Sequence, residues 1–211
     1  MDKMDNNIFT YLELKCLCSL INKDDLFGLN LRFKILEDTS FEDIKKSLIS
    51  KKILLDDDIT NYGMLIIELL RYYDDSEFHL EFKNLFISFN SNEDYLTIIK
   101  DKNNRMELCR FSKKKFLNQV IKNNSFYHSD SREYPKMVYK VSDKMEFTKD
   151  YTGFFTIKVF HKNTLIKHKL LCTNDTNGSI YNFKDSTLLK VGPIDLKQEL
   201  FNLFEMRDYN E

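Results

Sequence analysis

The chain of 211 residues contains no tryptophan and no alanine, and it has only five glycines and two prolines. The glycines are scattered along the chain, which excludes a glycine-rich phosphate-binding loop. No apolar run approaches the roughly 20 residues that a membrane-spanning helix needs. The N-terminal segment lacks the apolar core of a signal peptide. We therefore expect a cytoplasmic protein without membrane insertion.

Chemistry-bearing motifs are also scarce. The four cysteines, at positions 16, 18, 109 and 172, do not form the pair of pairs that is typical of a zinc site. His161 and His168 could face each other across a hairpin, but no third metal ligand accompanies them. The chain has no nucleophile elbow, no zinc-protease motif and no acidic calcium loop. We expect no metal, no cofactor and no catalytic residues, and therefore a protein that is not an enzyme.

The composition is that of an ordinary soluble globular protein. Hydrophobic residues make up 42% of the chain and charged residues 31%, with a formal net charge of -1. A net charge so close to zero gives no reason to expect nucleic acid or an anionic membrane as the partner.

The first part of the chain predicts three helices with polar caps. Thr10 and Glu13 have the spacing of a capping box, and Ser40 with Asp43 begins a second helix. Thr60 begins a third helix that is apolar on most of its sides, which predicts that it is buried.

Four short β-type runs follow, and their order returns near the C-terminus. The first set, Phe78–Phe82, Leu85–Phe89, Tyr95–Ile99 and Arg105–Phe111, leads into a helix capped by Ser112. In the second set, strands from Phe154 to Val191 lead into a helix that begins near Pro193. Aligning Lys100–Asp101 with Lys184–Asp185 places the apolar stripes of the two helices opposite each other, which favours an internal repeat.

These patterns predict an α+β fold of antiparallel sheets with flanking helices, arranged in two halves related by a quasi-twofold axis. The N-terminal half spans residues 1–123 and includes a winged-helix-like part. Residues 124–136 form a polar loop, and residues 137–211 form the C-terminal half.

The winged-helix outline raises the possibility of DNA binding, and the charges argue against it. Asp56, Asp57 and Asp58 precede the helix that would enter the major groove, where they would repel phosphate. Four lysines, Lys45, Lys46, Lys51 and Lys52, are the counter-argument, although a lysine run is more commonly a solvated helix face.

Several segments resemble the EspG-type secretion chaperones of type VII systems, and more closely their EsaE-like branch. The resemblance begins at the capped helix Phe9–Leu14 and continues through Phe41–Ile49 and Ile59–Gly63. It then follows the strands between Phe78 and Phe111 and ends with the helix Ile194–Phe204. It covers most of the chain as a pattern of elements and apolar positions.

The resemblance implies a cytosolic chaperone with two sheet-and-helix halves about a pseudo-twofold axis. Such a chaperone holds a helical protein or toxin soluble and delivers it to the secretion machinery without ATP or metal. The expected partner is thus a protein, a secreted substrate or toxin, and small helical hairpin proteins are further candidate partners. Two alternatives remain open: an immunity or antitoxin protein that neutralises a toxin, and a winged-helix regulator that binds DNA.

Aromatic residues on solvent-facing segments are typical interface anchors, and they supply the predicted partner-binding residues. For Phe86 and Phe89, ordinary packing within the sheet is an equally good interpretation. The set comprises Phe86, Phe89 and Tyr95 near a hairpin tip, and Tyr127, His128 and Tyr134 in the polar loop.

Overall fold

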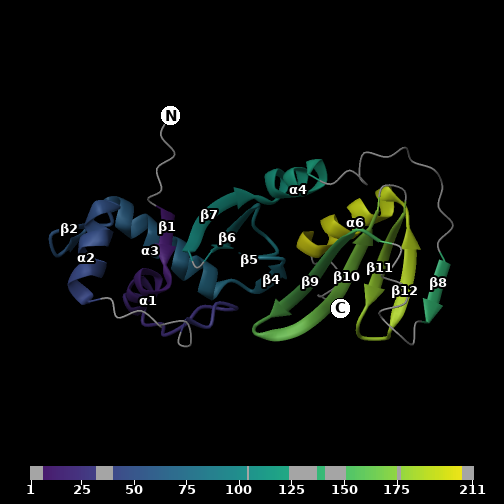
Figure 1. Cartoon of the computed structure of the whole chain (residues 1–211), viewed down its shortest axis with the longest axis horizontal. Coiled ribbons are helices and arrows are strands. Elements are labelled where there is room, and N and C mark those ends of the chain that lie inside the picture. The colour runs from purple at the N-terminus through teal and green to yellow at the C-terminus, as the bar shows by residue number, and fades with distance from the viewer. Residues whose placement is uncertain are drawn as a thin grey trace.

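A computed structural model describes residues 7–31, 40–103, 105–123, 137–140, 151–174 and 177–205. The fold is α+β, as predicted, with helices flanking one ten-stranded antiparallel sheet. The strands lie in the order β1-β7-β6-β5-β4-β9-β10-β11-β12-β8 across this sheet (Figure 1). None of the helices in the described ranges combines the length and apolar character needed to cross a membrane.

The N-terminal part contains three helices, each with the predicted cap. Helix α1 (Tyr11–Ser19) begins with a complete Thr10–Glu13 capping box, and Ser40 caps α2 (Phe41–Ser50). Thr60 caps α3 (Asn61–Asp75) by accepting a hydrogen bond from the amide of Gly63. Each cap satisfies a backbone N–H group that has no partner within its helix.

Two short features of this part were not predicted. Strand β1 (Ile8–Thr10) pairs with β7 at the edge of the large sheet. A separate small hairpin joins β2 (Leu54–Leu55) to β3 (Asp58–Ile59) between the second and third helices. Asp56 and Asp57 therefore form the turn of this hairpin, where Asp56 adopts a positive φ of 55°, and Asp58 begins β3.

The first four-stranded unit follows the predicted order. It contains β4 (Phe78–Phe82), β5 (Leu85–Phe89), β6 (Tyr95–Lys102) and β7 (Arg105–Ser112), followed by α4 (Lys113–Lys122). The first two of these strands form the hairpin that the winged-helix outline would use as a wing. In the structure this hairpin lies inside the sheet, since β4 pairs with β9 and β5 pairs with β6.

The second unit repeats this order. It contains β9 (Gly153–His161), β10 (Thr164–Thr173), β11 (Gly178–Asn182) and β12 (Thr187–Val191), followed by α6 (Pro193–Glu205). Strand β8 (Met137–Lys140) pairs with β12 and lies at the edge of the sheet. The predicted polar loop, residues 124–136, lies outside the described residues.

The strands of the two units follow each other in the same order outward from the central pair β4–β9. In this central pair, Leu80 lies opposite Val159. Each unit begins with a hairpin that turns at Lys-Asn, Lys83–Asn84 in one and Lys162–Asn163 in the other. Both turn lysines adopt a positive φ, 57° and 45°. This arrangement corresponds to the predicted quasi-twofold relation. The two halves are joined in one continuous sheet.

Two apolar cores lie on opposite faces of the sheet. One lies between the sheet and helices α4 and α6, and it includes Ile98, Phe116 and Phe204. The other lies between the first unit and helices α1–α3, and it includes Ile99. Adjacent residues of β6 thus enter different cores, because successive side chains of a strand point to opposite faces.

Candidate functional site

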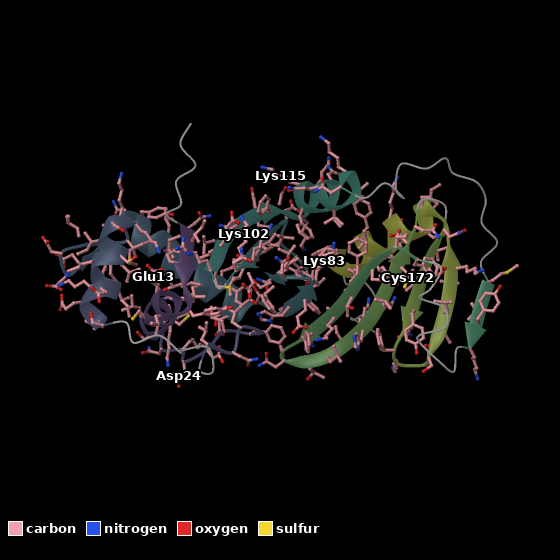
Figure 2. All side chains as sticks on the ribbon, viewed as in Figure 1. Glu13, Asp24, Lys83, Lys102, Lys115 and Cys172 are labelled. Carbon is pink, nitrogen blue, oxygen red and sulfur yellow. The ribbon has the colours of Figure 1, made fainter. Side chains whose placement is uncertain are left out.

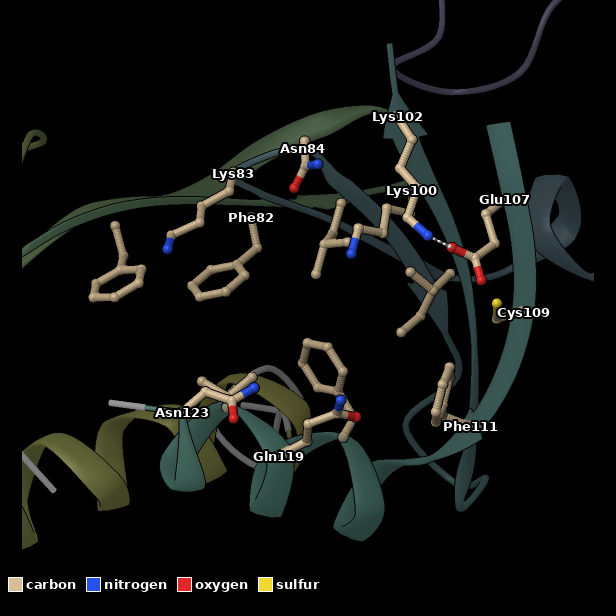
Figure 3. Close-up of a pocket in the computed structure, with 15 residues that line it drawn as sticks. Phe82, Lys83, Asn84, Lys100, Lys102, Glu107, Cys109, Phe111, Gln119 and Asn123 are labelled. Atoms are coloured by element: carbon tan, nitrogen blue, oxygen red, sulfur yellow. Dashed lines mark ion pairs between the residues drawn. The ribbon is translucent and has the colours of Figure 1, made fainter. Parts of the chain in front are cut away.

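A cleft of about 640 Å³ lies between the first sheet unit and α4, and we call it the sheet–α4 cleft. Strands β4 to β7 supply one wall, and α4 supplies the other (Figure 3). Phe155 on β9 also lines the cleft.

The floor of the cleft is apolar. Phe82, Ile98 and Phe116 are largely buried there, and Phe111 and Val120 are partly buried. Phe82 also stacks almost parallel to Phe155, with ring centroids 5.6 Å apart. Stacked and edge-packed aromatic rings make this a stable apolar surface.

The rim is polar and mostly exposed, and only Lys100 among its described residues is partly buried. Lys83 and Lys100 extend from the strands, while Gln119 and Asn123 face them from α4 (Figure 3). Within the whole molecule, Lys83 and Lys102 lie between the N-terminal helices and the second sheet unit (Figure 2). A polar rim around an apolar floor is the usual anatomy of a protein-binding surface.

Lys102 and Glu107 form an ion pair in the cleft. Lys102 Nζ lies 2.6 Å from Glu107 Oε2. The hydrogen bond from Lys102 lowers the pKa of Glu107 and keeps the carboxylate charged. Burial raises the pKa of the neighbouring Cys109 thiol to about 11, so this thiol is protonated at neutral pH. A protonated, partly buried thiol is a poor nucleophile.

The predicted partner-binding residues do not gather in one place. Phe86 packs among the residues of the α1–α3 core, and its ring would lie 2.6 Å from a Cβ atom at Gly28. Phe89 has no exposed surface, because its ring packs on Phe78 and Phe204 in the other core. The ring of Phe89 therefore serves packing and is not available as a surface anchor.

Tyr95 is the one predicted anchor among the described residues that is half-exposed, with 50% of its surface accessible. The Arg110 guanidinium lies 4.8 Å from its ring centroid and 5.7 Å from that of Tyr72. This group lies near α3, away from the sheet–α4 cleft. Tyr127, His128 and Tyr134 lie outside the described residues.

The two histidines considered as metal ligands are separated by the sheet. His161 stacks on Phe78, whereas His168 lies opposite Lys158 and stacks on Phe183. The alternation along β9 places His161 and Lys158 on opposite faces. Among the described residues, no group of three histidine, cysteine or acidic side chains could hold a metal ion.

A family model described as a domain of unknown function, DUF5081, matches residues 3–206. The chain belongs to this family. No curated protein matches the chain. The matched region includes both sheet units and every residue of the sheet–α4 cleft, so the cleft lies within the DUF5081 domain.

The sequence does carry a signal for the cleft, and it was missed. Ile98, Lys100 and Lys102 occupy every second position of β6, which predicts that they share one face of the strand, apolar at one end and basic at the other. The hairpin register places Lys100 opposite Leu85 and Glu107. Whether α4 covers this face or leaves it open depends on the distance between them, and this distance is set by tertiary packing.

Proposed function

We propose that this protein is a non-enzymatic chaperone that binds a type VII secretion substrate and keeps it soluble for export. The observation that carries this proposal is the sheet–α4 cleft, with its apolar floor and exposed polar rim. A chaperone of this kind covers apolar surface of its partner that would otherwise aggregate. The aromatic floor supplies contact area for such a surface.

The architecture supports the same proposal. The resemblance to EspG-type chaperones implies two sheet-and-helix halves about a pseudo-twofold axis. The strand order is symmetric about β4 and β9, and a helix follows each four-stranded unit.

Three observations disfavour the DNA-binding alternative. The hairpin that would act as a wing is hydrogen-bonded on both sides within the sheet. Lys51, one of the four lysines that argue for DNA binding, forms an ion pair with Glu13 at 2.5 Å. Lys45 on α2 pairs with Asp57. These pairs neutralise charge that a phosphate backbone would need.

The test is co-expression with a type VII substrate encoded beside this protein. We expect a stoichiometric complex on size-exclusion chromatography and a larger soluble fraction of the substrate than when it is expressed alone. The complex should form without ATP. A substrate that neither co-elutes nor becomes more soluble would refute the chaperone proposal.

The same complex separates the chaperone from an immunity protein. For a toxin substrate, an immunity protein must abolish toxin activity in the complex. A chaperone that covers a different apolar surface leaves the active site of the toxin accessible. Toxin activity that disappears on complex formation would favour the immunity alternative.

A further inference from the structure

The charges of the sheet–α4 cleft are not balanced. Its lining contains three lysines, Lys83, Lys100 and Lys102, and one acidic residue, Glu107. Glu107 is already paired with Lys102, and Lys100, its neighbour across the β6–β7 ladder, also interacts with it electrostatically. Within the described ranges, neither Lys83 nor Lys100 forms an ion pair with a carboxylate. The cleft therefore presents two ammonium groups beside an apolar floor.

Both lysines are held close to that floor. Lys83 Nζ lies 4.1 Å from the centroid of the Phe155 ring, a cation–π contact that fixes it at one end of the cleft. Lys100 is partly buried on β6, two residues from the floor residue Ile98, and its side chain points into the cleft (Figure 3). A ligand that reaches the floor thus lies next to positive charge.

The openness of the cleft indicates the size of its occupant. Small-molecule pockets of about 300–1,000 Å³ bury most of the ligand surface. Here the side chains of Lys83, Asn84, Gln119 and Asn123 at the rim are all exposed, so a free small molecule would remain in contact with solvent. A segment of a protein can instead insert a few large side chains and leave its backbone outside.

We propose that the sheet–α4 cleft binds a segment of the client protein that presents an apolar face flanked by carboxylates. The apolar side chains occupy the floor at Phe82, Phe111 and Phe116, and the carboxylates lie beside Lys83 and Lys100. This inference rests on the proposed chaperone function and names the kind of client segment that the chaperone recognises.

The first test uses two fluorescein-labelled peptides and the full chain. Both are amphipathic peptides of about 14 residues, about four helical turns, with Phe and Leu on one face. One carries Asp and Glu beside that face, and the other carries Lys at the same positions. Fluorescence anisotropy should show binding of the acidic peptide, and the lysine peptide should bind at least about tenfold more weakly because its like charges meet Lys83 and Lys100.

Charge-reversal variants then locate the site. The double variant Lys83→Glu/Lys100→Glu should weaken binding of the acidic peptide about tenfold, since each rim contact is modest. The matched control is Lys162→Glu, because Lys162 occupies the same Lys-Asn turn in the second sheet unit with a similar positive φ. The control should bind with wild-type affinity. Far-UV circular dichroism should show that all variants are folded.

Three results would overturn the inference. Equal affinity for the two peptides would remove the role of charge, and equal losses in the double variant and in Lys162→Glu would place the site elsewhere. Binding of dodecanoate that depends on Lys83 and Lys100, with no binding of the acidic peptide, would make the cleft a site for a free amphiphilic carboxylate.

The client complex separates failure of this inference from failure of the chaperone proposal. If the client co-elutes equally with the wild type and with the double variant, the cleft inference fails and the chaperone proposal stands. If no client is held by the wild type, the chaperone proposal fails, and the peptide experiment still decides what the cleft binds.

Discussion

Glu13 offers the sharpest test of how the N-terminal helices are held together. Its side chain is only 2% exposed, yet it carries a carboxylate (Figure 2). One oxygen accepts a hydrogen bond from the Thr10 amide at 2.6 Å, and the other accepts one from the Ser47 hydroxyl at 2.5 Å. Lys51 Nζ donates to both oxygens at 2.5 and 2.6 Å. The carboxylate therefore joins α1 to α2.

The substitution Glu13→Gln removes the charge and keeps the shape. It leaves the Lys51 ammonium, which is 19% exposed, without its counter-charge. Breaking a buried ion pair by removing one partner costs about 3–5 kcal/mol, and the partial access of Lys51 to water reduces this cost. We expect the free energy of unfolding to fall by about 2–3 kcal/mol, a large part of a typical domain stability of about 5–15 kcal/mol.

Urea unfolding followed by far-UV circular dichroism measures this loss, since the chain has no tryptophan for fluorescence. The control is Asp57→Asn, because Asp57 pairs with Lys45 on the surface and is 87% exposed. We expect no measurable change in the control. A Glu13→Gln variant no less stable than Asp57→Asn would refute the assigned role of the buried pair.

The acid limb of the stability curve provides a second readout. Burial alone would raise the pKa of Glu13, and the hydrogen bonds from Lys51, Ser47 and Thr10 outweigh burial and lower it. A lowered pKa in the folded state means that the stabilisation is complete above the ordinary value of 4.5 and is lost as the pH falls through the folded value. The stability difference between wild type and Glu13→Gln should therefore shrink in acid.

Three further outcomes are expected. Gly63→Ala should lower the free energy of unfolding by at least about 1 kcal/mol despite the better helix propensity of alanine, because the new Cβ would lie 2.3 Å from the Ile53 carbonyl oxygen; unchanged thermal unfolding would contradict this. Burial lowers the pKa of His79 in the folded protein, so the unfolded chain binds more protons than the folded one as the pH drops from about 8 to about 5.5. The free energy of unfolding should therefore fall over this range. The urea midpoint of the His79→Gln variant should depend less on pH than that of the wild type. The Cys109 thiol, whose pKa is about 11, should react with iodoacetamide far more slowly than free cysteine at neutral pH and faster as the pH rises; mass spectrometry of the Cys109 peptide measures the rate, and a rate equal to that of free cysteine would refute the assignment.

Local signals in the sequence were sufficient for most of the elements. The caps at Thr10, Ser40, Thr60 and Ser112 mark helix starts because each cap bonds to an amide only three residues away. The alternation within Phe78–Phe89 likewise predicts a hairpin, since its turn joins neighbouring strands. The repeat of strands and helix was visible for the same reason.

Strand pairs between residues far apart in the sequence determined the features that the local pattern did not predict. Strand β1 has three residues, too few for a periodic signal, and it is held by β7 about 100 residues along the chain. The pairing of β4 with β9 merges the two units into one sheet and removes the predicted wing. No local pattern encodes contacts that are formed so far apart in sequence.

The same division applies to the candidate site. By itself, the sequence determined that no recognised catalytic motif is present, and that Ile98, Lys100 and Lys102 lie on one face of β6. Tertiary structure decided that Phe86 and Phe89 enter different cores, and that α4 leaves Lys83 and Lys100 beside an open apolar floor. The physical reason is that residue spacing sets the face on which a side chain lies, whereas the packing of distant elements determines whether that face is covered.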